Sequence, residues 1–430
     1  MFFSFKEDLL HYLWKYQLFR TPDLKTKSGK SLHIIRQGIM QSNAGPDFIQ
    51  AKIQIDQITL AGTIEVHVKE TEWKQHRHHL DSAYNNVVLH VVWESRNDYT
   101  FLENQQAVEI LELHDIVDAQ LLARYATLMN SGVEVPCAKL YRDIDASLLQ
   151  LFFQTLSVQR LERKVIAILE LHQQINSNWN QVVFILLARY LGSNVNNEML
   201  QQLAFSIPVH VLYKNFDQPA IIEALLFGQS GLLQSHYADP YPVSLYREYQ
   251  YQKRLHGLEE MNASSWKYGR LRPASFPNIR IAQLAAMVTN GKWSIEQIVA
   301  IDSFETFKRL VRVPVNAYWN THYDFDKERS EIKVPIVGED TVVSLYINFL
   351  VPLVFAYGKA TDNGLLCEHA LGLLEHIPFE KNKVTSAFSF LNIERKCATE
   401  SQALIALKTN YCAVGRCLDC AIGNEILKGR

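Results

Sequence analysis

Two carboxylates and a group of histidines lie close together in residues 43–93. Asp47 follows a Gly-Pro pair, and Glu65 lies in the middle of the next predicted strand. Five of the fifteen histidines of the chain fall between His67 and His90, a density that packing alone does not explain. Carboxylate oxygens and imidazole nitrogens are common ligands of catalytic divalent metals. The stretch therefore predicts metal-assisted chemistry, without naming a substrate.

The two carboxylates are expected to meet across a hairpin. Side chains alternate between the faces of a strand, so Glu65, His67 and Lys69 share one face. Asp47 can approach Glu65 from the start of the preceding strand, and two close carboxylates repel unless a proton or a cation lies between them. Such a pair suits Mg²⁺ or Mn²⁺, with His67 and Lys69 positioning or deprotonating water. In the structural alternative, Asp47 only caps the turn and Glu65 forms a surface ion pair.

A histidine-rich loop follows the hairpin. Its candidate ligands are His76, His78 and Asp81, and nitrogen donors with one carboxylate suit Zn²⁺, Mn²⁺ or iron. Because the spacing matches no standard metal motif, two alternatives remain open. The loop can fold over the hairpin so that a histidine contacts a phosphate, or it can be a solvated polar loop. His90 lies between Leu89 and Val91, and is predicted to be buried and hydrogen bonded.

Three cysteines crowd together as Cys412-x4-Cys417-x2-Cys420. Thiolates at this density are typical of a structural zinc site, and an iron–sulfur cluster is also chemically allowed. A tetrahedral site needs a fourth ligand, and Cys397 is the nearest in sequence. The alternative ligands are Cys137 and Cys367. The competing interpretation is a set of reduced, buried thiols at the end of a helix.

A loop at residues 266–280 carries Lys267, Arg270 and Arg272 among aromatic residues. This mixture can grip phosphates and stack on bases, so the loop is a candidate contact for DNA or RNA. The alternative is a packed connector whose arginines pair with carboxylates.

The composition is that of a globular protein: 430 residues, 48% hydrophobic and 20% charged, with room for two or three domains. The net charge of −2 gives no overall attraction to nucleic acid, so any polyanion site has to be a local patch. Six cysteines in a chain of this length do not indicate a secreted disulfide framework. We expect a cytoplasmic protein with no membrane contact, because no signal peptide is visible and the apolar stretch 342–357 is short for a membrane span.

An amphipathic helix at residues 4–17 precedes the metal-ligand candidates, and Ser4 with Glu7 matches an N-terminal capping box. A turn is expected at residues 43–46 and a hairpin connection at Asp56-Gln57. The predicted strands are residues 31–36, 49–55, 59–69, 87–93 and 108–113. From about residue 143 the pattern changes to helical periodicity. We therefore expect an α/β domain over residues 1–135 and a mainly α-helical region over residues 140–430.

The order of turn, Pro-Asp, hairpin and Glu-x-basic resembles the PD-(D/E)xK nuclease superfamily. Pro46-Asp47 matches its first motif and Glu65-Val66-His67 its second, with His67 where that superfamily usually has lysine. The resemblance implies a restriction-endonuclease-like fold, in which helices flank a mixed sheet, and a metal ligand from the first helix, where Glu7 is placed. It also implies Mg²⁺ or Mn²⁺ and a nucleic-acid substrate. A neutral histidine can accept a proton but cannot supply the fixed positive charge of lysine.

The chain also resembles, nearly from end to end, one uncharacterised bacterial family known as domain of unknown function 2851. The segments that carry this resemblance are GPDF, IEVH, W-x2-H-x-H-x2-D-x2-Y, LHVVW, RLRPASFP and the clustered cysteines. This resemblance implies no activity, because none is assigned to that family.

The expected function is hydrolysis of phosphodiester bonds in nucleic acid by a divalent-metal-dependent nuclease, whose helical region clamps the substrate or a partner. The first alternative is a nuclease-like fold that has lost catalysis and acts as a binding protein or scaffold. The missing lysine and the near-neutral net charge favour that alternative. The second is a metal-dependent hydrolase built on the histidine loop.

Overall fold

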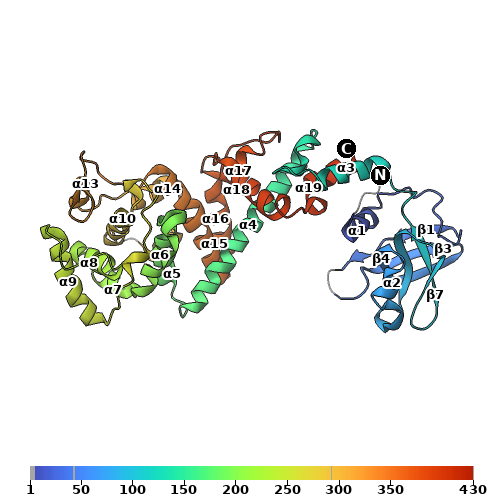
Figure 1. Cartoon of the computed structure of the whole chain (residues 1–430), viewed down its shortest axis with the longest axis horizontal. Helices are drawn as coiled ribbons and strands as arrows, with labels where there is room; N and C mark the ends of the chain where they lie inside the picture. Colours follow the sequence, from blue (N-terminus) through green and yellow to red (C-terminus); the bar gives the residue numbers. More distant parts are fainter. Residues whose placement is uncertain (1–4, 42–43, 292, 430) are drawn as a thin grey trace. The chain divides into compact units, whose positions relative to one another are not determined.

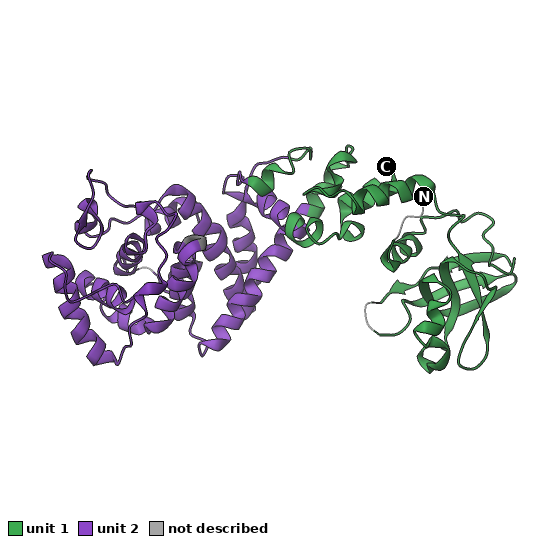
Figure 2. Ribbon diagram, viewed as in Figure 1, with its two compact units in different colours: residues 1–152, 383–393, 407–430 green, residues 153–382, 394–406 purple. Residues whose placement is uncertain are grey.

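The computed structural model describes residues 5–41, 44–291 and 293–429 (Figure 1). The chain forms two compact units, which Figure 2 shows in different colours. Unit 1 consists of residues 1–152, 383–393 and 407–430, and unit 2 of residues 153–382 and 394–406. These units differ from the contiguous ranges expected, 1–135 and 140–430, because two late segments of the chain pack with the N-terminal part.

Seven strands form one mixed sheet in unit 1, which confirms the predicted fold class of this part. The strands are β1 (Leu32–Arg36), β2 (Ile39–Met40), β3 (Phe48–Ile55), β4 (Ile58–Lys69), β5 (Val87–Glu94), β6 (Tyr99–Phe101) and β7 (Ala107–Glu112). Their order is β1-β3-β4-β5-β7-β6, and β2 pairs with β3. β3 and β4 form the expected antiparallel hairpin, while β5 runs parallel to both β4 and β7.

Both faces of β4 are buried at its centre. Ile64 and Val66 are inaccessible to solvent, and Glu65 and His67 on the other face are only 4% and 1% exposed. The face of β4 that carries Glu65 and His67 is therefore closed to solvent. Its buried polar groups need partners close by, because an unpaired buried charge is costly.

Helix α1 (Glu7–Tyr16) lies against β4. It begins with Lys6 in the N-cap position and no side-chain cap, so Glu7 is the first helical residue and not the third of a capping box. Ser4, the other half of that predicted box, lies outside the described residues. Glu7 and His11 lie one turn apart and share a face of the helix. The buried residues of α1 are Leu9, Leu10, Tyr12, Leu13 and Trp14.

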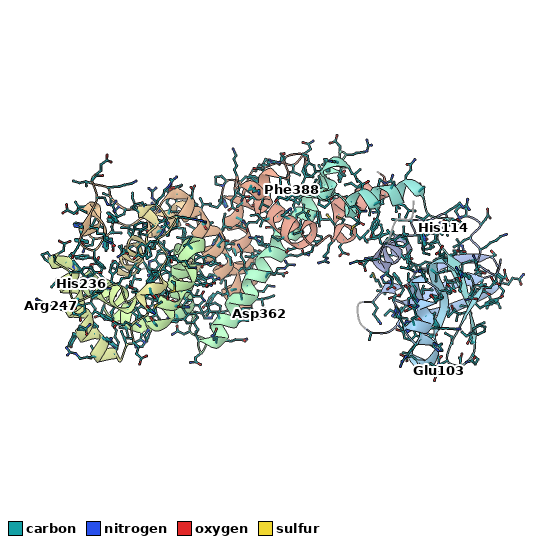
Figure 3. The ribbon with its side chains drawn as sticks, viewed as in Figure 1. Glu103, His114, His236, Arg247, Asp362 and Phe388 are labelled. Atoms are coloured by element: carbon teal, nitrogen blue, oxygen red, sulfur yellow. The ribbon has the colours of Figure 1, made fainter. Side chains whose placement is uncertain are left out.

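The connection from β4 to β5 carries the histidine loop. It is not the extended polar loop expected but three short helical turns, α2 (Glu72–Gln75), η1 (His78–Leu80) and η2 (Ser82–Tyr84). Trp73 anchors it, because its buried indole Nε1 donates a 3.1 Å hydrogen bond to the carbonyl oxygen of Phe101. Glu103, labelled in Figure 3, lies in the turn between β6 and β7 and accepts a 2.9 Å hydrogen bond from Asn85. These bonds fix where the histidines lie.

The remaining elements of unit 1 are helical. They are α3 (Ala119–Met129), η3 (Pro136–Lys139), α17 (Lys383–Ser386), η7 (Lys408–Cys412), η8 (Cys417–Asp419) and α19 (Ala421–Lys428). Arg124 of α3 donates a 2.9 Å hydrogen bond to the carbonyl oxygen of Leu427, so α19 is held against α3. The boundary between the units falls within the long helix α4 (Ala146–Gln174).

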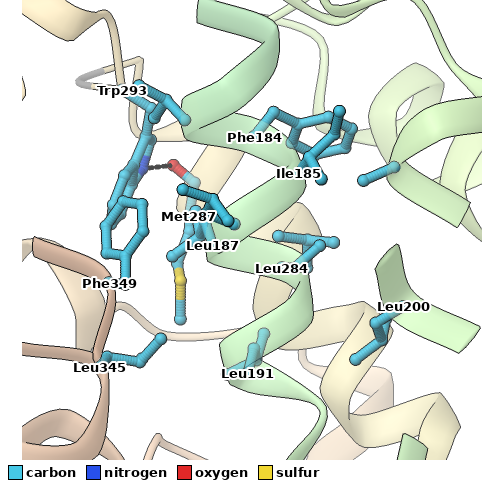
Figure 4. Close-up of a cluster of buried hydrophobic side chains, with 14 of the residues drawn as sticks. Phe184, Ile185, Leu187, Leu191, Leu200, Leu284, Met287, Trp293, Leu345 and Phe349 are labelled. Atoms are coloured by element: carbon cyan, nitrogen blue, oxygen red, sulfur yellow. Dashed lines mark hydrogen bonds between the residues drawn. The ribbon is translucent and has the colours of Figure 1, made fainter. Parts of the chain in front are cut away.

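Unit 2 is mainly α-helical, as predicted, apart from a small hairpin of β8 (His322–Asp324) and β9 (Lys327–Glu328). Its helices are α5 (Trp179–Leu191), α6 (Ser193–Ser206), α7 (Val209–Lys214), α8 (Pro219–Gln229), α9 (Pro240–His256), η4 (Ala263–Ser265), η5 (Pro273–Ser275), α10 (Pro277–Thr289), α11 (Ile295–Val299), α12 (Phe304–Val311), α13 (Tyr318–Thr321), α14 (Glu339–Leu345), η6 (Tyr346–Leu350), α15 (Val351–Ala360), α16 (Gly364–Glu375) and α18 (Ala398–Leu407). Its core packs α5, α10 and η6 together around Trp293, whose indole Nε1 donates to the carbonyl oxygen of Met287 at 2.7 Å (Figure 4).

The most apolar helical segment, Glu339–Ala360, belongs to this core. Among the described residues it is the one helix that passes a length and composition test for crossing a membrane, with a mean hydropathy of 1.7 over its most apolar window. Within unit 2, however, 72% of that window is buried. Burial against neighbouring helices accounts for its composition.

Candidate metal centre

Asp47 and Glu65 lie next to each other at the start of the β3–β4 hairpin. The Asp47 carboxylate Oδ2 accepts a 2.9 Å hydrogen bond from the backbone N–H of Val66. In return, the backbone N–H of Asp47 donates to Glu65 Oε2 at 3.2 Å. The turn expected at residues 43–46 begins at Asn43, which lies outside the described residues. The reciprocal bonds hold both side chains in place, but each of them faces a different set of donors.

Asp47 faces α1, where it joins Glu7 and His11 in what we call the α1 group. Their ligand atoms all lie within 4.8 Å of one another. His11 Nε2 lies 3.2 Å from Asp47 Oδ2 and 3.6 Å from Glu7 Oε1. This nitrogen is buried, and neither carboxylate is aligned with it as a hydrogen-bond acceptor. The nitrogen lies within reach of both carboxylates, so this group can be bridged by a proton or by a metal ion.

Glu65 faces the other way, towards His67, His76 and His78, which we call the histidine group. The ligand atoms of the three histidines lie within 4.8 Å of one another. His67 Nε2 is 3.2 Å from His76 Nδ1, and Glu65 Oε1 is 3.3 Å from His78 Nε2 and 3.6 Å from His67 Nε2. The site thus combines three imidazoles with one carboxylate.

Behind the site, a relay of hydrogen bonds orients the ring of His67. Its Nδ1 lies 2.8 Å from His90 Nε2, and His90 Nδ1 lies 2.8 Å from Thr100 Oγ1. When each ring donates through Nδ1, the Nε2 atom of His67 keeps its lone pair. This atom faces His76. Metal-bound histidines commonly donate their second ring nitrogen to a buried acceptor in this manner. His90 is fully buried, as the sequence favoured.

Burial and neighbouring charges shift the pKa values of the site in different directions. Burial, with help from His78 and His76, lowers the pKa of His67 to about 3. Burial raises the pKa of Glu7 to about 7, although His11 opposes that rise, and burial also raises the pKa of Glu65. Burial alone would lower the pKa of His11, but Asp47 and Glu7 outweigh it and raise this pKa. A neutral His67 has its lone pair ready for a metal, whereas the raised pKa values of Glu7, Glu65 and His11 mean that protons compete with a metal at these groups.

The distances and the donor types both fit a metal. Neighbouring ligands of one ion, each at about 2.1 Å, lie roughly 3.0–3.4 Å apart. The 3.2–3.6 Å separations in the two groups are close to that range. The histidine group with Glu65 suits Zn²⁺, Mn²⁺ or iron, whereas the α1 group, with two carboxylates, suits Mn²⁺ or Mg²⁺.

The structure leaves several predicted residues outside these two groups. Lys69 is exposed at the end of β4. Asp81 is exposed too, and its carboxylate caps η2 by accepting a 2.9 Å hydrogen bond from the backbone N–H of Ala83. The three basic residues proposed to contact nucleic acid are exposed in unit 2, whereas the metal centre belongs to unit 1. They are Lys267, Arg270 and Arg272.

Sequence reasoning missed His11 and Thr100. The signal for His11 was present, since Glu7 and His11 are four residues apart on an amphipathic helix. No pattern links Thr100 to His90, because β6 is only three residues long and its pairing depends on the fold.

Of the cysteines considered as a fourth ligand, a different one lies beside the three clustered cysteines. Cys397 belongs to unit 2, where it directly precedes α18, while Cys412, Cys417 and Cys420 belong to unit 1. A ten-residue helix extends about 15 Å, which separates Cys397 from the other three. Cys137, the more distant residue in sequence, lies beside them instead.

A family model described as a protein of unknown function (DUF2851) matches residues 7–383. The matched range includes both metal-ligand groups, from Glu7 to His78, and ends before the three clustered cysteines. No curated protein and no solved structure matches the chain.

Proposed function

The chain belongs to the DUF2851 family, whose function is unknown, and from its metal centre we propose that it is a divalent-metal-dependent hydrolase that cleaves phosphodiester bonds in nucleic acid. The observation that carries this proposal is the position of Glu65 between two sets of ligands. Its Oε2 accepts from the backbone of Asp47, and its Oε1 lies 3.3 Å from His78. One carboxylate thus faces the histidine group and is tied by its other oxygen to the backbone of Asp47, which belongs to the α1 group.

The residues that would hold metal follow from the donor sets. Glu65 and the histidine group suit Zn²⁺ or Mn²⁺, and the α1 group suits Mn²⁺ or Mg²⁺. A divalent ion bound there lowers the pKa of water and stabilises charge on a phosphoryl oxygen. The chain itself orients His67 through His90 and holds Asp47 through the backbone N–H of Val66.

Nucleic acid is favoured as substrate by the arrangement of the motif. Pro46-Asp47 opens a hairpin, Glu65-x-His67 lies on its second strand, and a parallel strand follows, as in nucleases of the PD-(D/E)xK type. Because His67 is neutral, it cannot provide the positive charge that lysine gives. The charge of the phosphate therefore has to be balanced by metal. Lys267, Arg270 and Arg272, which are exposed in unit 2, stay candidate contacts for nucleic acid.

A second candidate function is metal-stabilised binding or scaffolding without catalysis. The burial of Glu65 and His67, at 4% and 1% exposed, favours it, because a phosphodiester has to reach the ligands. The open side of the site is formed by His76, which is exposed, and by Glu7, whose side chain is 37% exposed. Substrate access in the proposed hydrolase is therefore expected past these two residues.

The proposal is tested by assaying the metal-free full chain after addition of Mg²⁺, Mn²⁺ or Zn²⁺. The substrates are single- and double-stranded DNA and RNA. We expect cleavage of at least one substrate, which stops on chelation and returns when the metal is restored. Metal binding measured by titration calorimetry, without cleavage of any substrate, would support the scaffold instead. No binding of any of the three metals would overturn both candidates.

Metal affinity is expected to depend on pH. A ligand has to lose its proton before it binds, and the pKa of Glu7 in the metal-free protein is about 7. Its raised pKa means that Glu7 is protonated below pH 7, so Mn²⁺ affinity should rise with pH, by up to about tenfold per pH unit below 7. His11, whose pKa is also raised, adds to this slope.

Titration calorimetry at several pH values between 6 and 8 measures this slope. Glu7→Gln should reduce the slope, while Glu94→Gln, which changes an exposed glutamate at the end of β5, should leave it unchanged. An affinity that stays constant over this range would show that the α1 group does not bind the metal.

A further inference from the structure

Four cysteines meet in unit 1, away from the candidate metal centre. Cys137, Cys412, Cys417 and Cys420 line one small cavity of about 10 Å³. That volume is at the lower limit for holding a single water molecule. The other residues around the cavity are Pro136, Leu407, Tyr411, Ile422 and Gly423. The four cysteines therefore border one nearly dry, mostly apolar space.

The local backbone is shaped to bring the thiols together. Cys137 lies in η3, Cys412 ends the π-helical turn η7, Cys417 begins η8, and Cys420 is the N-cap of α19. Gly423 lets η8 pack on α19, because a Cβ atom at this position would lie 2.1 Å from the carbonyl oxygen of Cys417. Any side chain here would push Cys417 away from the other cysteines.

The backbone beside the sulfur of Cys420 supplies hydrogen-bond donors. The backbone N–H groups of Ile422 and Gly423 donate to its Sγ. These groups belong to the first turn of α19, where the partial positive charge of the helix favours an anion. N–H donation to sulfur stabilises a thiolate without using a charged side chain.

Other roles for four adjacent thiols fit less well. All four are free cysteines and none forms a disulfide. Reactive cysteines are accessible to solvent, whereas Cys137, Cys417 and Cys420 are buried. Packing alone would not select four sulfurs for one cavity, because any apolar side chains fill such a space equally well.

We propose that Cys137, Cys412, Cys417 and Cys420 together bind a structural metal centre through four thiolates, either a zinc ion or an iron–sulfur cluster. Zinc prefers a tetrahedral set of thiolates in structural sites, and iron–sulfur clusters are held by four cysteines. Binding of Zn²⁺ forms four Zn–S bonds and releases the four thiol protons to solvent. This site is independent of the proposed hydrolase activity.

The centre fastens the segment 407–429 to η3 and to the helices beside it. η8 lies against α1, and α19 lies against α3 and η3. Lys408 supports the same junction, because its Nζ donates to the carbonyl oxygen of Glu134 and lies 3.7 Å from the carboxylate of Glu134. A metal-thiolate link between Cys137 and Cys412 closes a very long loop, which reduces the entropy of the unfolded chain.

The first experiment is elemental analysis with X-ray absorption on the full chain, purified without oxygen. We expect a bound metal with sulfur neighbours, at about 2.3 Å if it is zinc, whereas an iron–sulfur cluster gives visible absorption and stoichiometric iron and sulfide. To exclude signal from the histidine group, the same measurement is made on Glu65→Gln. Absence of metal, or a metal with only nitrogen and oxygen neighbours, overturns the proposal.

Substitutions identify the ligands. Cys137→Ser and Cys417→Ser should each lose most of the thiolate-bound metal, while Cys367→Ser and Cys397→Ser, both in unit 2, should keep it. Because the first two variants can fail to fold, the wild-type chain is also titrated with a mercurial reagent. The amount of metal released should rise with the number of modified thiols, and release should be complete when four cysteines have reacted. Retention of metal in Cys137→Ser, or its loss in Cys397→Ser, would contradict the assignment.

Discussion

Replacing Glu65 with glutamine is expected to lower metal-dependent hydrolysis by about 10²- to 10⁴-fold, the range seen when a group central to proton transfer or charge stabilisation is removed. Glutamine has nearly the same shape and can still accept the hydrogen bond from the backbone of Asp47. It removes the negative charge that faces His67 and His78, at 3.6 Å and 3.3 Å. The histidine group then loses its only close carboxylate among the described residues.

The measurement compares Zn²⁺ and Mn²⁺ affinity, and cleavage rate, between Glu65→Gln and the wild type. Asp81→Asn is the matched control, because it also neutralises one carboxylate in this region but changes only the cap of η2. Thermal unfolding should be little changed in either variant. Equal rates for Glu65→Gln and the wild type would remove the basis of the proposed function.

The second large effect is expected from Gly62→Ala, a change in the sheet behind the site. An added Cβ would lie 2.3 Å from the carbonyl oxygen of Asn86 and 2.6 Å from Val88 Cγ1. That carbonyl accepts the hydrogen bond of Thr63 at 2.9 Å, at the point where the parallel β4–β5 pairing shifts by one residue. Separating these strands destabilises unit 1, by about 3 kcal/mol for overpacking of this severity.

Such a loss corresponds to a decrease in Tm of about 6–12 °C for a domain of this size, measurable by differential scanning calorimetry. Because the same pairing places Glu65 opposite His90, metal affinity should fall as well. Gly372→Ala on α16 is the chemical control, since no atom lies within 4 Å of its added Cβ. It should stabilise its helix by roughly 0.5–1 kcal/mol. If Gly62→Ala left the Tm unchanged, the β4–β5 junction would not be rigid.

The central sheet could be predicted from the sequence because its long strands carry clear local signals. Alternation of buried and polar residues located β3 and β4, and a run of β-branched residues located β5. The two shortest strands were missed, because two or three residues, as in Ile39–Met40 and Tyr99–Phe101, are too few to show a period. The family resemblance is confirmed, whereas the resemblance to nucleases stays a prediction.

The candidate site was only partly predictable, since its contacts join residues that are distant in sequence. The hairpin itself brings Asp47 to Glu65, so their approach followed from strand pairing. Asp47 faces α1 and Glu65 faces the histidines. These directions depend on how α1 and the β4–β5 connection pack on the sheet. Sequence spacing could not show that Asp47 and Glu65 would face two different groups of ligands.

The cysteine site illustrates the same limit. Cys397 was favoured as the fourth ligand because it is the nearest other cysteine in sequence. However, the helix α18 lies between Cys397 and the three clustered cysteines. Cys137 lies beside the cluster because η3 and α19 pack together, and no local pattern records that packing.

The division of unit 1 among early and late segments of the chain has a consequence for biosynthesis. Residues 1–152 leave the ribosome long before residues 407–429, while nearly all of unit 2 is translated in between. At about 5–20 residues per second, the delay is roughly ten seconds to a minute. During that time the surface of α3 that receives α19 is uncovered, and Cys137 has none of its partner thiols. A nascent chain halted within unit 2 therefore carries an incomplete first unit, which is a ready substrate for chaperones and proteases.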